Sequence, residues 1–264
     1  MDASIEIEIT RYTSDGAVRM FDAVVAEAPV EFRLQEVPIA VLMRTPGHDE
    51  ELGLGFALTE GIVLRPAEVA GVHRRSSDPD GDRYDIVLAP GVTVDPEQFR
   101  RNLYTTSSCG VCGKASIDAV RVAAPALVPG PRIPPALLLT LPTAMRSHQS
   151  AFDETGGIHA AAIFGGDGSL LVVREDIGRH NAVDKAIGFV AADRWPMGEL
   201  ILVVSGRVSF EMVQKAAVAG IPVVCGVSAA SSLAADLGQE LGATVVGFLR
   251  PEGFNVYAGS TRIA

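Results

Sequence analysis

The spacing of apolar and polar residues differs between the first part of the chain and the second. Ile5, Ile7 and Ile9 alternate with glutamates, which is compatible with an edge strand or with an unstructured terminus. Gln35 and Glu36 separate two apolar runs that predict two strands joined by a turn. The elements expected next are a helix over 46–61, strands over 69–75 and 83–88, and a short helix beginning at Asp95. This pattern predicts a small α+β unit.

The second part alternates strands with helices. Strands are expected over 169–174, 200–205, 222–227 and 244–249, and helices over 137–150, 156–164, 179–192, 209–219 and 231–241. Such alternation predicts a mostly parallel sheet with helices on both faces. In folds of this kind, ligands bind beyond the carboxyl ends of the strands.

A proline-rich stretch separates the two parts. Five prolines stand at positions 125, 129, 131, 134 and 135, which is typical of a connection between domains. We therefore predict an α/β protein with a smaller N-terminal α+β domain over 1–130, which carries a Cys-x-x-Cys loop, and a second domain over 131–264. A chain of 264 residues is long enough for two such cores.

Composition narrows the possible functions. The net charge of −10 and the pI of about 5.0 argue against nonspecific binding to nucleic acid or to anionic membranes. Hydrophobic residues make up 48% of the chain, which is typical of a well-packed protein and compatible with an oligomer interface. No apolar run approaches the roughly twenty residues of a membrane helix, and no secretory signal is apparent. Three cysteines, an odd number, fit a reducing compartment, so we expect a cytoplasmic protein.

The most reactive segment is the loop that contains Cys109 and Cys112. A glycine follows each cysteine, so either sulfur can approach another molecule closely. A predicted helix begins just after the loop, and Lys114 adds positive charge there. Both features favour the thiolate, which is the nucleophilic form. This environment suits attack on a disulfide or on a sulfur donor.

Spacing alone leaves three interpretations of this cysteine pair open. The first is reactive sulfur chemistry, the second a redox dithiol and the third a structural zinc site. Zinc is disfavoured because the chain has neither a second cysteine pair nor histidines at ligand spacing. A thioredoxin-like dithiol would follow the first strand of its sheet, whereas about a hundred residues precede Cys109. Cys225 lies in an apolar strand and is expected to be a buried hydrophobic residue.

Polar side chains follow the predicted strands of the second part. The donors that we expect at the strand ends are Arg179, Lys185, Ser205 and Arg207, at positions where helix starts favour anions. The turn after the last strand contains Arg250 and Glu252, which are compatible either with a guanine nucleotide contact or with a plain hairpin. The chain also has His48, which suits the start of a helix, and His159, which suits packing within one.

Six segments together resemble the formate dehydrogenase accessory sulfurtransferase family, usually called FdhD. They are Met-Arg-Thr-Pro-Gly-His-Asp-Glu-Glu-Leu at 43–52, Ser-Ser-Cys-Gly-Val-Cys-Gly-Lys at 107–114, Thr-Gly-Gly-Ile-His-Ala-Ala at 155–161, Arg-Glu-Asp-Ile-Gly-Arg-His-Asn-Ala-Val-Asp-Lys at 174–185, Ser-Gly-Arg at 205–207 and Gly-Phe-Leu-Arg at 247–250. They appear in the family's order from about Pro29 onward, which makes the resemblance far more specific than a lone cysteine pair.

The resemblance implies a sulfur carrier protein. In that family, a cysteine desulfurase hands sulfane sulfur to a loop thiol, and the carrier passes it to the bis-guanine-dinucleotide molybdenum cofactor (bis-MGD) of formate dehydrogenase. On this basis Cys109 is expected to bear the persulfide, with Cys112 as its partner or as a second carrier. Guanine nucleotide contacts are implied for Phe248, Leu249, Arg250, Pro251, Glu252 and Gly253. The implied fold of the second domain is a three-layer α/β/α, cytidine-deaminase-like fold, in a homodimer without the deaminase zinc.

Two other functions remain compatible with the residues themselves. A cofactor chaperone would bind the same ligand but would not need the loop thiols. A thiol-disulfide oxidoreductase would need the thiols and would ignore guanine nucleotides. The resemblance assigns no role to His48, His159 or His180.

Overall fold

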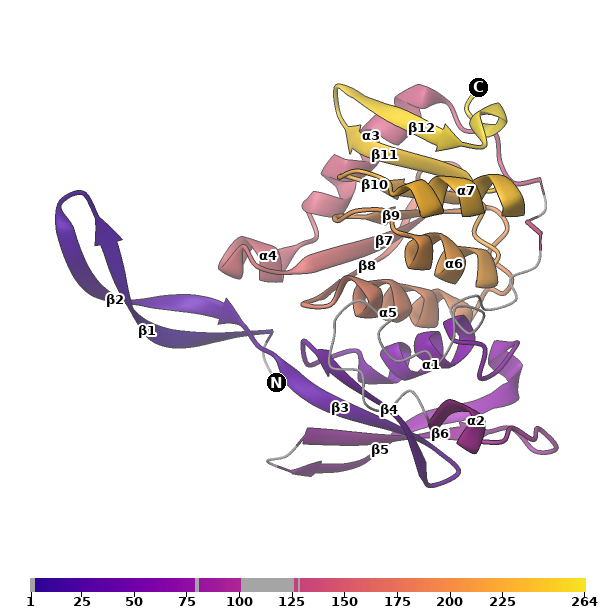
Figure 1. Ribbon diagram of the computed structural model, residues 1–264, viewed down its shortest axis with the longest axis horizontal. Coiled ribbons are helices and arrows are strands. Elements are labelled where there is room, and N and C mark those ends of the chain that lie inside the picture. The colour runs from indigo at the N-terminus through magenta and orange to yellow at the C-terminus, as the bar shows by residue number, and fades with distance from the viewer. Residues whose placement is uncertain (1–2, 79–80, 101–125, 128) are drawn as a thin grey trace.

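The computed structural model of the chain describes residues 3–78, 81–100, 126–127 and 129–264. Its strands form three sheets, with two, four and six strands among these residues. Figure 1 shows the four-stranded sheet below, the six-stranded sheet above and the two-stranded hairpin projecting to one side. None of the helices in the described ranges is both long and apolar enough to cross a membrane.

A four-stranded sheet and the helix α1 form the N-terminal unit. Its strand order is β4-β3-β6-β5, with β3 and β6 parallel and the other pairs antiparallel. The elements are β3 (Ala28–Leu34), β4 (Val37–Arg44), α1 (Asp49–Thr59), a 3-10 helix (Pro66–Glu68), β5 (Val69–Asp78), β6 (Gly81–Leu88) and α2 (Glu97–Arg100). The turn predicted at Gln35 and Glu36 is confirmed, and both residues adopt left-handed angles, with φ of 50° and 68°. The expected α+β unit is therefore present.

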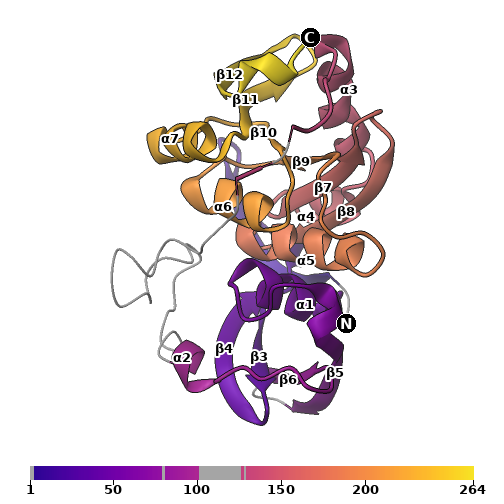
Figure 2. The same cartoon turned by 90° about the vertical axis from the view of Figure 1, so that its right-hand side faces the viewer.

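The second unit is a six-stranded sheet between two layers of helices, in the order β12-β11-β10-β9-β7-β8. Its strands are β7 (His159–Gly165), β8 (Leu170–Asp176), β9 (Leu200–Val204), β10 (Val223–Gly226), β11 (Thr244–Arg250) and β12 (Gly253–Ala258). Its helices are α3 (Pro135–Arg146), α4 (Ser150–Thr155), α5 (Arg179–Ala191), α6 (Phe210–Val218) and α7 (Ser232–Leu241), with a 3-10 helix at Ser260–Arg262. Figure 2 shows α3 on the side of the sheet opposite α6 and α7. The expected three-layer α/β/α architecture is confirmed.

Three expectations for this unit were wrong. The stretch 156–164 is not a helix but contains β7, which is paired with β8 and β9. Its successive side chains enter two different cores, Ala162 on one face and Ile163 on the other, so burial on both faces overrides alanine's helix propensity. The helix expected over 137–150 is two helices, α3 and α4. The sheet is mixed, because only β9, β10 and β11 are parallel.

The two units meet where α1 packs directly on α5 (Figure 1). A Cβ on Gly55 would lie 1.9 Å from the carbonyl oxygen of Asp184, and a Cβ on Gly188 would lie 1.9 Å from that of Glu51. Only glycine fits at either position, so the two helix backbones approach closely. One apolar core continues from Phe32 of the four-stranded sheet through this contact into the larger unit. The domain boundary at residue 130 stays a prediction.

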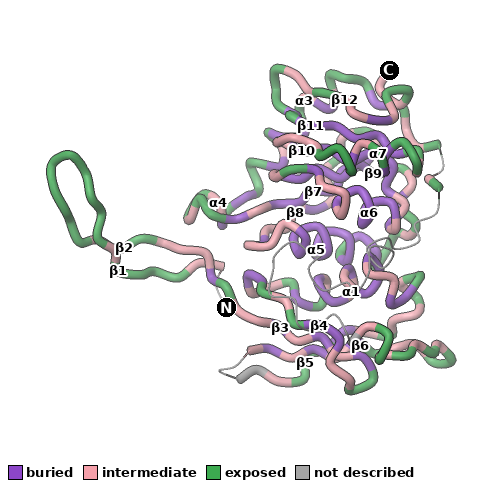
Figure 3. The backbone as a smooth tube through the Cα atoms, in the orientation of Figure 1, coloured by how far each residue is buried: buried purple, intermediate pink, exposed green. Residues whose placement is uncertain are grey.

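The N-terminal hairpin lies outside both units. It comprises β1 (Ser4–Thr13) and β2 (Gly16–Val25), which pair along their whole length. Its base touches α4, where the Ser4 hydroxyl donates to Glu154 at 2.7 Å. Figure 3 shows that most of the hairpin is exposed, whereas buried residues concentrate around α1, α5 and the central strands. Of the two alternatives that the alternating isoleucines left open, the structure shows the strand.

Candidate functional site

The carboxyl ends of the three parallel strands lie at one edge of the six-stranded sheet. The start of β7 and the end of β8 lie at the same edge, because Ala161 pairs with Val204 and His159 pairs with Asp176. We call this edge, with the segments 176–180, 205–209, 227–231 and 248–253 that follow its strands, the rim. The structure thus brings together the strand ends from which the sequence predicted anion binding.

Backbone hydrogen bonds connect neighbouring segments of the rim. The amide of Val208 donates to Ala229 at 3.0 Å, and the amide of Phe248 donates to Ser228 at 2.9 Å. A Cβ on Gly247 would lie 3.1 Å from the Ala230 nitrogen, so the last strand passes close to the segment before α7. These contacts hold the rim segments in a defined order without using side-chain donors, which leaves those donors available.

Two buried polar atoms at the rim have no hydrogen-bond partner within the described residues. They are Nε of Arg179, at the start of α5, and Oγ of Ser209, at the N-cap of α6. The equivalent N-cap of α7 differs, because Ser231 accepts from the Ala234 amide at 3.2 Å. Leaving a buried polar group unpaired typically costs about 1–3 kcal/mol. Such groups are expected where a ligand completes the hydrogen bonding.

His159 lies at the start of β7, next to Gly206. A Cβ on Gly206 would lie 3.5 Å from the ring's Nδ1 atom, which is an ordinary contact distance, so the imidazole lies directly against this segment of the rim. Burial lowers the pKa of His159, and the positive charges of Arg179 and Arg207 lower it further. The imidazole is therefore neutral at neutral pH, and its surroundings are positive in a chain whose net charge is −10. The helical packing role expected for His159 is wrong, since it begins a strand.

His180 connects the first turns of the two helices that start at the rim. Its Nε2 atom lies 2.5 Å from Oε2 of Glu211, so α5 is tied to α6 beside the unpartnered atoms of Arg179 and Ser209. The sequence did not predict this link, because the two residues are 31 positions apart along the chain.

The other predicted donors differ in their availability. Arg207 is exposed, and the Ser205 hydroxyl accepts from the Ala160 amide at 2.9 Å, which leaves its own proton free to donate. The expectation for Lys185 needs correction. Its side chain is only 1% exposed, and its ammonium lies 2.7 Å from Asp176 and 2.8 Å from the Thr45 carbonyl oxygen. Lys185 therefore stabilises the rim from the protein interior, and its side chain is not accessible to a ligand.

Asp176, which the sequence analysis did not single out, organises this support. Besides Lys185, its carboxylate accepts from the amides of Thr45 and Gly178 and from the Asn181 side chain. Burial raises the pKa of Asp176, whereas the Lys185 ammonium lowers it. The Asp-Ile-Gly sequence after a predicted strand was the available signal, since an aspartate two residues before a helix start commonly binds backbone amides.

The predicted guanine-contact residues lie at the end of β11, in the turn at Pro251 and Glu252, and at the start of β12. Phe248 adopts a left-handed conformation, with φ of 52°, and the residue is 41% exposed. Such a conformation is uncommon for a bulky residue. Arg250, Pro251 and Glu252 are exposed, Gly253 is half-buried, and the Leu249 side chain is fully buried in the core. The hairpin is confirmed, and the guanine contact stays a prediction.

A separate cavity of about 420 Å³ lies beside the N-terminal unit, and its lining residues include Asp49, Glu50, Glu51 and Asp82. Three of these carboxylates are paired with arginines, namely Asp49 with Arg44, Asp82 with Arg44 and Arg74, and Glu51 with Arg174. His48 occupies the N-cap position of α1, but its ring does not cap the helix; Nδ1 lies 3.3 Å from Glu51 instead. The predicted position of His48 at the helix start is confirmed, whereas a capping role is not.

Of the three cysteines, only Cys225 lies within the residues that the structure describes. Cys109 and Cys112 lie outside the described residues. Cys225 is fully buried in β10, where burial raises the pKa of its thiol. The prediction that Cys225 is a buried, unreactive residue is confirmed.

Known proteins resemble this chain over nearly its whole length. The model of the FdhD/NarQ family matches residues 25–264. A Streptomyces coelicolor protein named sulfur carrier protein FdhD is 50% identical over 260 residues, which cover 95% of this chain and 92% of that protein. A Mycolicibacterium paratuberculosis protein of the same name is 45% identical, with both chains covered completely.

A solved structure agrees with the fold. The crystal structure of a candidate formate dehydrogenase accessory protein from Desulfotalea psychrophila matches with a TM-score of 0.77 and 24% identity, covering 100% of both chains. At this identity the likeness shows the shared fold. The chain therefore belongs to the FdhD/NarQ family.

Proposed function

We propose that this chain is a cytoplasmic sulfur carrier for formate dehydrogenase. It accepts sulfane sulfur from a cysteine desulfurase as a persulfide on Cys109 and transfers that sulfur to bis-MGD. The relatives named sulfur carrier protein FdhD support this function, and they are up to 50% identical to this chain. The accessible thiols expected from Ser-Ser-Cys-Gly-Val-Cys-Gly support the chemistry.

The observation that carries the cofactor part of the proposal is the pair of unpartnered atoms at the rim, Arg179 Nε and Ser209 Oγ. Each guanine dinucleotide arm of bis-MGD contains a pyrophosphate, and phosphate oxygens accept hydrogen bonds from such donors at helix starts. The exposed side chains of Arg207 and Arg250 add positive charge. The exposed Phe248 ring offers a flat surface for a base.

The first step of the sulfur transfer involves no net oxidation or reduction. The Cys109 thiolate attacks the terminal sulfur of the desulfurase persulfide, a new S–S bond forms on Cys109, and the desulfurase cysteine leaves as a thiolate. Release as sulfide needs two electrons. Attack of the Cys112 thiolate on the Cys109 sulfur supplies them, since it forms a Cys109–Cys112 disulfide and releases hydrosulfide. A thiol reductant then restores the pair.

A mass measurement tests the acceptor. After incubation with a cysteine desulfurase and cysteine, the parent protein should gain one sulfur atom on the peptide that contains Cys109, and a thiol reductant should remove it. Cys109→Ala should lose this gain. Cys225→Ala is the matched control, because its thiol is buried, and it should accept sulfur as the parent does. Equal sulfur uptake by Cys109→Ala would show that the acceptor is misassigned.

A second experiment separates transfer from chaperoning. A variant that lacks both loop thiols, Cys109→Ala with Cys112→Ala, should bind GDP as the parent does but should fail to activate formate dehydrogenase. Full activation by this variant would favour a cofactor chaperone. Turnover of model disulfides without GDP binding would favour a thiol-disulfide oxidoreductase.

A further inference from the structure

The segment that joins β4 to α1 connects the N-terminal unit to the rim. Thr45 in this segment is only 1% exposed, and it forms two hydrogen bonds with the first residues of the rim segment 176–180. Its amide donates to Asp176 at 3.1 Å, and its hydroxyl accepts from the Ile177 amide at 3.1 Å. One residue of the N-terminal unit therefore holds two successive residues of the rim.

Two side chains of α5 add to this contact. The Lys185 ammonium donates to the Thr45 carbonyl oxygen at 2.8 Å. The Asn181 amide group donates to the Met43 carbonyl oxygen at 2.8 Å and to Asp176 at 3.0 Å. Both side chains are buried, where hydrogen bonds are stronger than in water and leaving one unmade is costly. The start of α5 is therefore fixed relative to the N-terminal unit.

Arg179 lies between residues that these hydrogen bonds hold in place. Before it, the Gly178 amide donates to Asp176 at 2.8 Å. After it, His180 binds Glu211 of α6. The Nε atom of Arg179 is buried and has no partner within the described ranges. A donor that is held in one geometry before its ligand arrives loses less conformational entropy on binding, so the backbone around Arg179 is organised in advance for an acceptor.

We propose that Thr45 is a positioning residue of the rim. Through Asp176 and Ile177 it holds Arg179 where this side chain receives a phosphate of the ligand. This inference rests on the function proposed above, in which the rim binds the guanine dinucleotide arms of bis-MGD, and it makes that binding depend on the N-terminal unit. By thermodynamic linkage, a nucleotide bound at the rim also stabilises the contact between the two units.

A pair of substitutions at Thr45 tests this role. Thr45→Val keeps the shape of the side chain but removes the acceptor of the Ile177 amide. Its GDP affinity, measured by isothermal titration calorimetry, should be about five- to tenfold lower than that of the parent, as expected for the loss of one supporting hydrogen bond. Thr45→Ser keeps the hydroxyl and should bind GDP within about twofold of the parent.

Thr59→Val is the matched control. Thr59 is also 1% exposed, ends α1 and donates to Asp184 of α5 at 2.8 Å. Its hydroxyl also accepts from Lys215, and neither partner belongs to the rim. This variant should lose stability but keep its GDP affinity within about twofold of the parent. The control separates the loss of positioning from a general weakening of the contact between the units.

Amide hydrogen exchange gives a measurement that does not depend on GDP. Relative to β10, residues 176–181 should exchange faster in Thr45→Val than in the parent, and at the parent's rate in Thr59→Val. In the parent, GDP should slow exchange in 176–181 and in 43–48, because the ligand stabilises their contact. If Thr45→Val does not fold, Asn181→Ala is the second variant, since it removes the bond to the Met43 carbonyl oxygen and should cause the same two changes.

Three results would overturn the proposal. They are parental GDP affinity in both Thr45→Val and Asn181→Ala, an equal loss of affinity in Thr59→Val, and exchange in 176–181 that is the same in Thr45→Val as in the parent. A parent protein that does not bind GDP would overturn the cofactor part of the proposed function instead. The exchange comparison between Thr45→Val and Thr59→Val would then decide whether Thr45 positions the rim.

Discussion

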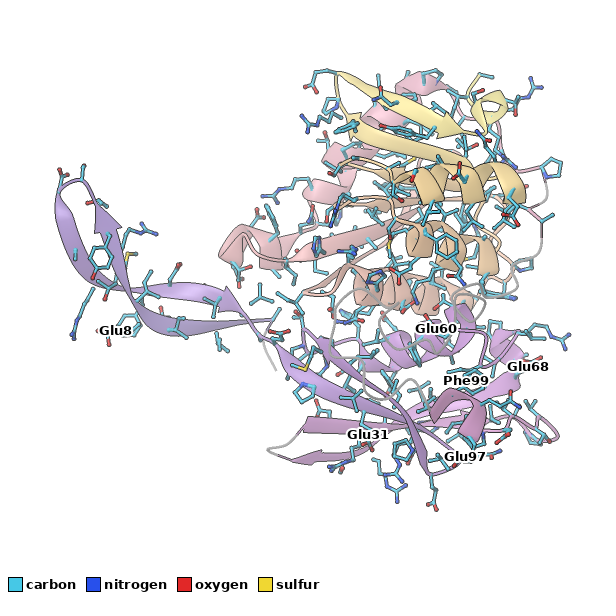
Figure 4. The ribbon with its side chains drawn as sticks, viewed as in Figure 1. Glu8, Glu31, Glu60, Glu68, Glu97 and Phe99 are labelled. Carbon is cyan, nitrogen blue, oxygen red and sulfur yellow. The ribbon has the colours of Figure 1, made fainter. Side chains whose placement is uncertain are left out.

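The rim and the interface between α1, α5 and α6 use the same kinds of residue in opposite ways. At the interface, the ammonium of Lys215 lies 2.9 Å from each of Asp184, Glu60 and the Thr59 hydroxyl. Figure 4 shows Glu60 where the two units meet. At the rim, Arg179 Nε and Ser209 Oγ have no partner within the described part of the chain. The charges at the interface are therefore fully paired, whereas the rim contains buried polar atoms whose hydrogen bonding is incomplete.

Helix α5 takes part in both regions, which makes the comparison direct. Arg179 in its first turn belongs to the rim, whereas Asp184 and Lys185 are buried and paired. Burial lowers the pKa of Lys215, but the Asp184 and Glu60 carboxylates outweigh this and raise it. Lys215 therefore stays charged. A buried charge is tolerated only when such partners are present.

The largest effect is expected from removing the interface cation. Lys215→Met removes the counter-charge of the buried Asp184, and it should lower the free energy of unfolding by about 3–5 kcal/mol. Denaturant titration measures this loss. Arg207→Met, at the exposed rim, is the control and should change stability by less than about 0.5 kcal/mol. Equal losses in the two variants would contradict the distinction between paired and available charges.

A smaller loss is expected from separating the two helices. Gly188→Ala places a methyl group against the Glu51 carbonyl oxygen, so α1 and α5 must move apart, at a cost of about 1–3 kcal/mol. Thermal unfolding provides the measurement. Gly157→Ala is the matched control, because the nearest atom to its new methyl group would be 3.7 Å away. A Gly188→Ala protein as stable as the parent would mean that this contact is loosely packed.

At the rim, binding and stability should change in opposite directions. Ser209→Ala removes an unpaired hydroxyl, so the free energy of unfolding should stay level or rise by up to about 1 kcal/mol, while GDP affinity falls severalfold. Arg179→Ala should weaken GDP binding by about tenfold. Isothermal titration calorimetry measures both, with the exposed Arg194→Ala as control. Unchanged GDP affinity in both rim variants would remove the rim from the proposed site.

The smallest effect is a pH dependence of the contact between the two units. Burial raises the pKa of Glu51, but hydrogen bonds from Arg174 and His48 outweigh it and lower that pKa to about 2. A carboxylate with a lowered pKa stabilises the fold above its ordinary value of 4.5, and this stabilisation is lost as the pH falls toward about 2. The loss should be about 1 kcal/mol, since the pair is partly exposed. Between pH 6 and pH 2.5 the free energy of unfolding should fall less steeply for Glu51→Gln than for the parent. Parallel curves of this free energy against pH would contradict the prediction.

Local sequence patterns predicted most of the elements correctly. The turn at Gln35 and Glu36, the helix α1 and the strands and helices from Arg179 to Arg250 lie close to the expected positions. The family and its sulfur chemistry also followed from short motifs, because glycines, cysteines and charged residues at fixed spacing are visible along the chain. These features depend on neighbours within a few positions, so the sequence by itself determines them.

The tertiary structure decided what depends on distant partners. The alanine-rich segment of β7 is a strand because it pairs with β8 and β9 and is buried on both faces. Lys185 does not belong to the predicted site because its ammonium binds Asp176 and the Thr45 carbonyl oxygen. The same holds for the missing partners of Arg179 and Ser209. Whether a polar atom is satisfied depends on which atoms surround it after folding, and residues 31 or 140 positions apart, as in the His180–Glu211 and Lys185–Thr45 contacts, leave no local pattern.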